Sequence, residues 1–211
     1  MIGDAGFLYA CSAGKFLRVL KIPMSVVTDQ MIEKHAQFLP MLTVLGVSYC
    51  LKITSQGIEA LGNCCKSLVE LRRNMPPPNH MADQDNGVAL DESEAMSIAD
   101  TMHNIEHLEL AYGRFSDHGL DAILSKCRGL RVLDLRGCWN CRLEGKTESK
   151  YSLTLIQSVR NPWEIDDEDP NSSDDDEENN EEEEEDDDDD SDIALVDVDT
   201  YEDYDDGDGY D

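Results

Sequence analysis

The sequence has few basic residues and no long apolar run. Lys and Arg number 17 against 47 Asp and Glu, and no basic stripe is present that would favour binding to the phosphates of a nucleic acid. No apolar segment approaches the ~20 residues that a membrane-spanning helix needs. The N-terminal segment lacks a basic leading region and contains Asp4, which argues against a signal peptide. We therefore expect neither a nucleic acid nor a membrane as partner.

Recognisable catalytic motifs are also missing. We find no Gly-rich phosphate loop, no G-x-S-x-G elbow and no Cys/His nucleophile arrangement. His103 and His107 are four residues apart, but the pattern puts the first at a helix end and the second in the following strand, so they do not form a metalloprotease motif. We therefore expect a non-catalytic protein that holds no metal and no cofactor.

The charge divides the chain into two parts. From Glu164 onward lie 29 of the 47 acidic residues and no Lys or Arg, which leaves 18 acidic and 17 basic residues before that point. Residues 164–211 contain unbroken acidic blocks and little apolar surface, a composition that predicts a disordered acidic tail. The remainder is a nearly neutral body of ordinary domain size.

A leucine-rich unit recurs along the body. Its pattern is L-x-x-L-x-[VL]-x-x-C, and the two clearest copies are Leu42, Leu45, Val47 and Cys50, and Leu130, Leu133, Leu135 and Cys138. First positions of the unit are Leu17, Leu42, Leu68, Ile105 and Leu130. Leucine-rich repeats run to about 20–29 residues, and three of the four intervals fit, at 25, 26 and 25 residues. The fourth, of 37 residues, contains a proline-rich and polar insertion at residues 75–91.

These repeats predict an α/β fold, a leucine-rich-repeat solenoid with a short curved parallel sheet and outer helices. We assign it residues 17–163, with residues 1–16 as an N-terminal remnant or cap. The best-defined helix is expected over residues 55–64, and Thr54, Ser55 and Asp117 are candidate N-caps. Residues 151–159 are expected to add one more strand, with Trp163 packed over it.

Four of the seven cysteines occupy equivalent repeat positions. Cys50 and Cys138 each lie eight residues after a first position, and Cys65 and Cys127 each lie three residues before the next one. Small buried side chains fit both places. The alternative is a zinc site built on Cys138-x-x-Cys141 and the Cys64–Cys65 pair, but four ligands at metal spacing do not emerge. We interpret the cysteines as reduced thiols, and those at the four repeat positions as buried.

Side chains alternate between the faces of a strand, so the residues between the inward leucines should line the concave surface. Arginine is enriched at protein-interface hot spots and pairs well with carboxylates. The predicted partner-binding residues, which are to hold a protein substrate, are Arg72, His107, Glu109, Asp134 and Arg136. The alternative is an ordinary solvated face.

Arg73 departs from the repeat, because the register puts it where other units carry a buried aliphatic residue. A buried and unpaired arginine is costly. We therefore expect the strand to bulge at Arg73, or the side chain to turn outward toward the insertion.

The tail holds two short motifs. Ser172 and Ser173 precede acidic residues and resemble substrates of acidophilic kinases, so both are candidate phosphorylation sites. Ile193, Leu195 and Val196 form an apolar island with acidic flanks, a pattern that resembles SUMO-interacting motifs. The acidic run itself is either solubilising or a site for basic proteins such as histones.

Several segments resemble plant F-box/leucine-rich-repeat proteins. They are LGVSYC (45–50), KSLVELRRNM (66–75), DESEAMSIADTM (91–102), HLELAYGR (107–114) and LDLRGCWN (133–140). The resemblance covers residues 13–163 and includes Arg73 and the insertion. It implies the substrate-recognition part of an SCF-type E3 ubiquitin ligase, in which the repeats hold the target and the F-box binds a Skp-type adaptor.

None of the sixteen residues before Leu17 reads as an F-box. We therefore interpret the chain as a truncated form, a partial gene model or a relative without ligase function, which would bind a Skp-type adaptor only if an F-box were supplied. Phe7, Leu8, Phe16 and Leu20 are then expected to be exposed or poorly covered. The alternative family is that of acidic leucine-rich nuclear proteins, which bind histones but have shorter repeats. The nucleus and the cytoplasm both fit this chain.

Overall fold

Six short strands form one parallel sheet in which the strand order follows the chain. The computed structural model describes residues 2–12, 14–78, 89–143 and 156–164. The strands are β1 (Val19–Lys21), β2 (Val44–Gly46), β3 (Glu70–Arg72), β4 (His107–Glu109), β5 (Val132–Asp134) and β6 (Ser158–Arg160). Each begins two residues after the first position of a repeat. The register aligns the central residues of neighbouring strands, so Leu45 pairs with Leu71 and Leu108 pairs with Leu133.

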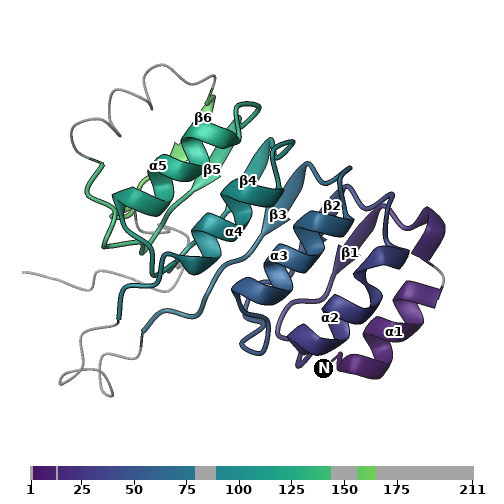
Figure 1. Cartoon of the computed structure of the whole chain (residues 1–211). Coiled ribbons are helices and arrows are strands. Elements are labelled where there is room, and N and C mark those ends of the chain that lie inside the picture. Colours follow the sequence, from purple (N-terminus) through teal and green to yellow (C-terminus); the bar gives the residue numbers. More distant parts are fainter. Residues whose placement is uncertain (1, 13, 79–88, 144–155, 165–211) are drawn as a thin grey trace, which may run out of the picture. The chain divides into compact units, whose positions relative to one another are not determined.

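Five α-helices lie side by side over one face of this sheet (Figure 1). They are α1 (Asp4–Ser12), α2 (Asp29–His35), α3 (Ser55–Cys64), α4 (Ser93–Thr101) and α5 (Asp117–Lys126), and two short 3₁₀ helices, η1 (Gly14–Phe16) and η2 (Ala36–Phe38), accompany the first two. The α/β class is therefore confirmed, and the arrangement is compatible with stacked leucine-rich repeats. The predicted helix over residues 55–64 is confirmed.

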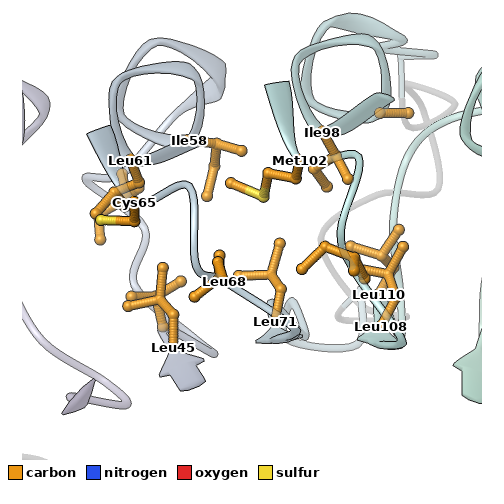
Figure 2. Packing of buried hydrophobic residues seen from close by; sticks show 14 of the residues in the cluster. Leu45, Ile58, Leu61, Cys65, Leu68, Leu71, Ile98, Met102, Leu108 and Leu110 are labelled. Carbon is orange, nitrogen blue, oxygen red and sulfur yellow. The ribbon is translucent and has the colours of Figure 1, made fainter. Parts of the chain in front are cut away.

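The core lies between the sheet and the helices. Figure 2 shows Leu45, Leu71 and Leu108 of the strands pointing toward Ile58 and Ile98 of the helices. All five side chains are fully buried. Burial of such a side chain contributes about 1.5–3 kcal/mol, so the regular spacing of leucines is what holds the two layers together.

Helix starts are joined from one repeat to the next by carboxylates. Asp29 at the start of α2 accepts hydrogen bonds from the backbone N–H and the hydroxyl of Thr54, at 2.9 and 2.6 Å. Equivalent bonds run from Thr28 to Asp4, from Ser116 to Glu92 and from Leu143 to Asp117. Because orphan N–H groups at a helix start need acceptors, the carboxylates of Asp4, Asp29 and Glu92 complete the N-terminal caps of α2, α3 and α5.

Two details of the predicted caps and ends differ. The N-cap of α3 is Thr54, as predicted, but that of α5 is Ser116 and not Asp117, because the Ser116 hydroxyl accepts the N–H of His118. The sixth strand is Ser158–Arg160, while residues 151–155 lie outside the described part. Trp163, predicted to pack over this strand, is 58% exposed.

Four apolar residues at the N-terminal end were expected to be exposed or poorly covered, and for two of them this prediction is wrong. Phe7 and Leu20 are buried, because α1 packs against α2 and closes that end of the core. Leu8 and Phe16 are exposed, as expected, with Phe16 87% exposed.

All seven cysteines are free thiols. Cys50 and Cys138, at equivalent repeat positions, donate to the carbonyl oxygens of Ile22 and Leu110, each at 3.1 Å and each 28 residues upstream. Cys127 donates to Met102 O in the same way, at 3.5 Å. The thiols thus fill space and also satisfy backbone acceptors of the preceding repeat. Among the described residues, no group of three or more His, Cys, Asp or Glu side chains is arranged to hold a metal ion.

Arg73 neither bulges the strand nor turns outward, so that prediction is wrong. Its side chain is 2% exposed and points into the core layer. The guanidinium pairs with Glu94 of α4, with Nε 3.1 Å from Oε1. It also donates to the carbonyl oxygens of Val47, Cys50 and Ile53, at 3.4, 3.1 and 2.6 Å. Each of the three guanidinium nitrogens of Arg73 therefore has a hydrogen-bond partner.

Arg73 performs the role of the repeat cysteine that its own unit lacks. The position equivalent to Cys50 in this repeat is Pro76, which has no hydrogen to donate. Arg73 instead donates to Val47 O, the acceptor that corresponds to Ile22 O and Leu110 O. Burial raises the pKa of the Glu94 carboxyl, and the charge of Arg73 opposes that rise.

In the described part of the chain, no helix combines the length and the apolar character needed to cross a membrane.

Replacing Arg73 with Met is expected to lower the free energy of unfolding by about 3–5 kcal/mol, because a buried ion pair loses one partner. Carbonyl oxygens of Cys50 and Ile53 also lose their donor. Urea titration followed by circular dichroism measures the change. The matched control is Arg131→Met, whose 3.6 Å contact with Glu106 is exposed and should contribute about 0–1 kcal/mol. Equal losses in both variants would contradict the assigned role of Arg73.

Iodoacetamide at pH 8.5 is expected to modify the folded protein mainly at Cys64, the one cysteine that is only half-buried. Burial raises the pKa of Cys65 and Cys138 to about 12 and that of Cys11 and Cys127 to about 11, so these thiols stay protonated. The pKa of a cysteine in the unfolded chain is about 8.5. The stability gained by burying these protonated thiols is therefore present below pH ~8.5 and is lost as pH rises toward the folded pKa values. Mass spectrometry of native and urea-unfolded samples measures the labelling. Rapid labelling of Cys138 in the native sample would contradict the predicted protection of the buried thiols.

Candidate protein-binding face

The face of the sheet away from the helices, here called the open face, carries the side chains between the inward leucines. In β3 and β4 the outer residues are half-buried while the central leucine is fully buried. The parallel register brings residues of neighbouring repeats level with each other, as with Arg72 and Glu109. Strand alternation therefore placed this face correctly from the sequence.

All five predicted binding residues line one hollow of about 450 Å³ on the open face. They come from β3, β4 and β5, and from Arg136 just after β5. Ser158 and Arg160 of β6 line the same hollow. Neither residue was predicted from the sequence, because no leucine-type first position had been assigned to this repeat. Ile156, two residues before β6, is that position.

Four polar side chains are joined on the β3–β4 side of the hollow. Arg72 Nε lies 2.7 Å from Glu70 Oε1 and 3.4 Å from Glu109 Oε1. His107 Nε2 lies 3.0 Å from the same oxygen of Glu109. The hydrogen bond to Glu70 raises the pKa of Arg72, so its guanidinium is held charged and in place. At 40% exposure the Arg72 side chain remains open to a partner.

A second ion pair forms the β5–β6 side. Arg136 holds Asp134 through two nitrogens, with Nε 3.0 Å from Oδ1 and Nη2 2.7 Å from Oδ2. Arg160 Nη1 lies 4.0 Å from the same carboxylate. Asp134 is only 4% exposed. Because both ends of this pair are fixed before binding, a partner that contacts Arg136 loses little conformational freedom of the arginine.

The hollow therefore presents oriented donors and acceptors of both signs. Such an arrangement suits a polar protein surface with carboxylates opposite Arg72 and Arg136 and a donor opposite Glu109.

Four aromatic side chains, three exposed and one half-buried, were not predicted as site residues from the sequence. Tyr49, Tyr112 and Trp163 each lie seven residues after a first position, and Trp139 lies beside them. We call these four residues the aromatic edge, since they follow the strands at one edge of the sheet. The signal was present in the sequence as a tyrosine at the same place in LGVSYC and LELAYG.

Predicted site residues in the tail lie outside the described residues. These are Ser172, Ser173, Ile193, Leu195 and Val196.

No family model matches the chain. It is similar to several curated proteins of Arabidopsis thaliana. F-box protein FBW2 is 41% identical over 143 residues, which are 68% of this chain and 44% of that protein. F-box protein SKIP19 is 33% identical over 155 residues, 73% of this chain and 47% of that protein. Putative F-box/LRR-repeat protein 22 is 32% identical over 160 residues, 76% of this chain and 49% of that protein.

The chain spans about half the length of the relatives it matches. These relatives are named for an F-box, and several are also named for leucine-rich repeats. The parallel sheet, whose strand order follows the chain, is compatible with such repeats. The chain belongs to the plant family of F-box and F-box/leucine-rich-repeat proteins.

Proposed function

We propose that this chain is the target-binding part of a substrate-recognition subunit of an SCF-type E3 ubiquitin ligase. In this proposal the repeats form a leucine-rich-repeat solenoid and the open face holds a protein target. The chain itself is a non-catalytic adaptor that needs no cofactor. A Skp-type adaptor joins through an F-box, and the nucleus and the cytoplasm are the places of action.

The observation that carries the proposal is the ion-paired hollow of the open face on a member of this family. Arg72 and Arg136 are held by carboxylates at 2.7 Å, yet Arg72 keeps much of its surface exposed. Arginines held in this way are typical anchors of protein interfaces. The family relation then supplies the purpose of such binding, which is to bring a protein to ubiquitination.

The acidic leucine-rich nuclear proteins are the weaker alternative. Described repeats of this chain begin 25 to 26 residues apart outside the insertion, and the similar proteins carry F-box names. Histone binding, phosphorylation of Ser172 and Ser173, and SUMO binding at residues 193–196 are proposals that concern the tail alone.

Capture of protein targets is expected to depend on the open face. The tagged chain is expressed in plant cells with a proteasome inhibitor, and co-purified proteins are quantified by mass spectrometry. Arg72→Ala combined with Arg136→Lys should reduce capture about tenfold, since a single hot-spot anchor contributes about 1.4 kcal/mol or more. Arg136→Lys keeps the charge beside Asp134 but loses the two-pronged contact. The control is Glu59→Ala, on the exposed side of α3.

Two readouts connect capture to the ligase role. Captured proteins should change half-life when the level of the chain changes, and the change should vanish with proteasome inhibitor. A direct pull-down of a Skp-type adaptor, with an F-box/leucine-rich-repeat relative as positive control, measures adaptor binding by this chain. Targets that bind but never change half-life would contradict the ligase proposal.

A further inference from the structure

Two hollows meet at Tyr112 and Trp139 of the aromatic edge. One, of about 500 Å³, is also lined by prolines 76–78. The other, of about 600 Å³, is also lined by Tyr49 and Trp163. Trp139 is 50% exposed and Trp163 is 58% exposed. Together the two hollows form a groove walled by aromatic and proline rings, and it is separate from the polar hollow of the open face except at Arg136.

The rings of the groove are held in position. Tyr112 lies across Gly137, so closely that a Cβ atom at that glycine would overlap the tyrosine ring. Trp139 meets Tyr112 edge to face, with ring centroids 6.1 Å apart and planes at 79°. The backbone N–H of Tyr112 donates to the carbonyl oxygen of Arg136 at 2.7 Å. A groove with fixed walls loses little freedom when a ligand enters it.

The backbone gives no reason for tyrosine at these positions. Tyr49 and Tyr112 have φ of 60°, in the left-handed region, and Gly137 occupies the equivalent place with φ of 70°. Glycine adopts this conformation without cost, whereas a bulky side chain is strained. Residues held in strained conformations concentrate at functional sites. The rings are therefore present for what they contact.

The charge of the groove favours an acidic ligand. Arg114 is the only charged side chain among the described residues that line the first hollow. Arg136 and Glu164 line the second. Arg136 is already paired with Asp134, so a ligand carboxylate meets attraction mainly at Arg114, at one end of the groove and beside an apolar wall.

We propose that this groove binds an extended segment of the target protein that carries a proline next to an acidic residue. The pyrrolidine ring packs on Trp139 and Tyr112, and the carboxylate meets Arg114. Aromatic-walled grooves take up proline-containing segments in the polyproline II conformation, which is extended before binding. The inference rests on the proposed function, because it names the kind of segment that the target presents.

A random 12-residue peptide library displayed on phage tests the proposal with the full chain as bait. Enriched peptides are expected to contain a proline within three residues of Asp or Glu. The strongest of them is then titrated by fluorescence anisotropy. Trp139→Ala should weaken its binding about tenfold, as at an interface hot spot, while Glu59→Ala leaves binding unchanged. A second peptide carries Asn or Gln in place of the acidic residue. In the Arg114→Gln variant, the ratio of the affinities for the acidic and the uncharged peptide should fall to about one.

Tyr49→Gly separates a binding role from a structural one. Glycine relieves the left-handed strain, so we expect the melting temperature to stay equal or rise while peptide affinity falls. A lower melting temperature with unchanged affinity would assign Tyr49 to structure alone.

The proposal is overturned if nothing is enriched, if only basic peptides are enriched, or if Trp139→Ala leaves the affinity unchanged. Peptides lost with Arg72→Ala but kept with Trp139→Ala would place the binding on the open face instead. None of these results concerns half-life or adaptor binding, so the ligase proposal fails or stands on its own readouts.

Discussion

Each repeat of this protein leaves backbone polar groups that only the next repeat can satisfy. The strands are three residues long, and a strand of that length has no stability alone. The hydrogen-bond ladder continues past them, because Tyr49, Tyr112 and Gly137 donate to the carbonyl oxygens of Asn74, Arg136 and Pro162 in the following repeat, at 2.7–2.8 Å. Lateral pairing is therefore the constraint on which the helices, the open face and the aromatic edge all depend.

The same constraint explains why different side chains appear at equivalent junctions. Carboxylates of Asp29 and Glu92 cap the next helix, the thiols of Cys50 and Cys138 reach back to carbonyl oxygens of the preceding repeat, and Arg73 does so where no cysteine is present. Each solution supplies the hydrogen bond that a buried backbone group requires. A charged residue is acceptable in the core here because Glu94 and three carbonyl oxygens surround it.

Periodicity was sufficient to predict the repeats, the helix at residues 55–64, the buried cysteines and the open face. It failed where side chains meet partners distant in sequence. Register alone showed that Arg73 occupies an inward position, but nothing near it in sequence pointed to Glu94, which lies 21 residues later. The aromatic edge was missed for another reason. Its residues follow the strands, where the two-residue alternation no longer applies, and only alignment of one repeat on another brings Tyr49, Tyr112 and Trp163 together.

The Arg73–Glu94 pair also bears on how the molecule unfolds. In a repeat array each unit contacts only its neighbours, so cooperativity passes through every junction in turn. Twenty residues separate the end of β3 from the start of α4, more than between any other strand and the helix that follows it in the described part of the chain, and a junction of this kind is where an array divides into separately melting blocks. Arg73 reaches from the strand before the excursion to the helix after it, and it also holds the turn of the preceding repeat. One side chain thus ties three successive segments together and favours a single unfolding transition for the repeats on both sides.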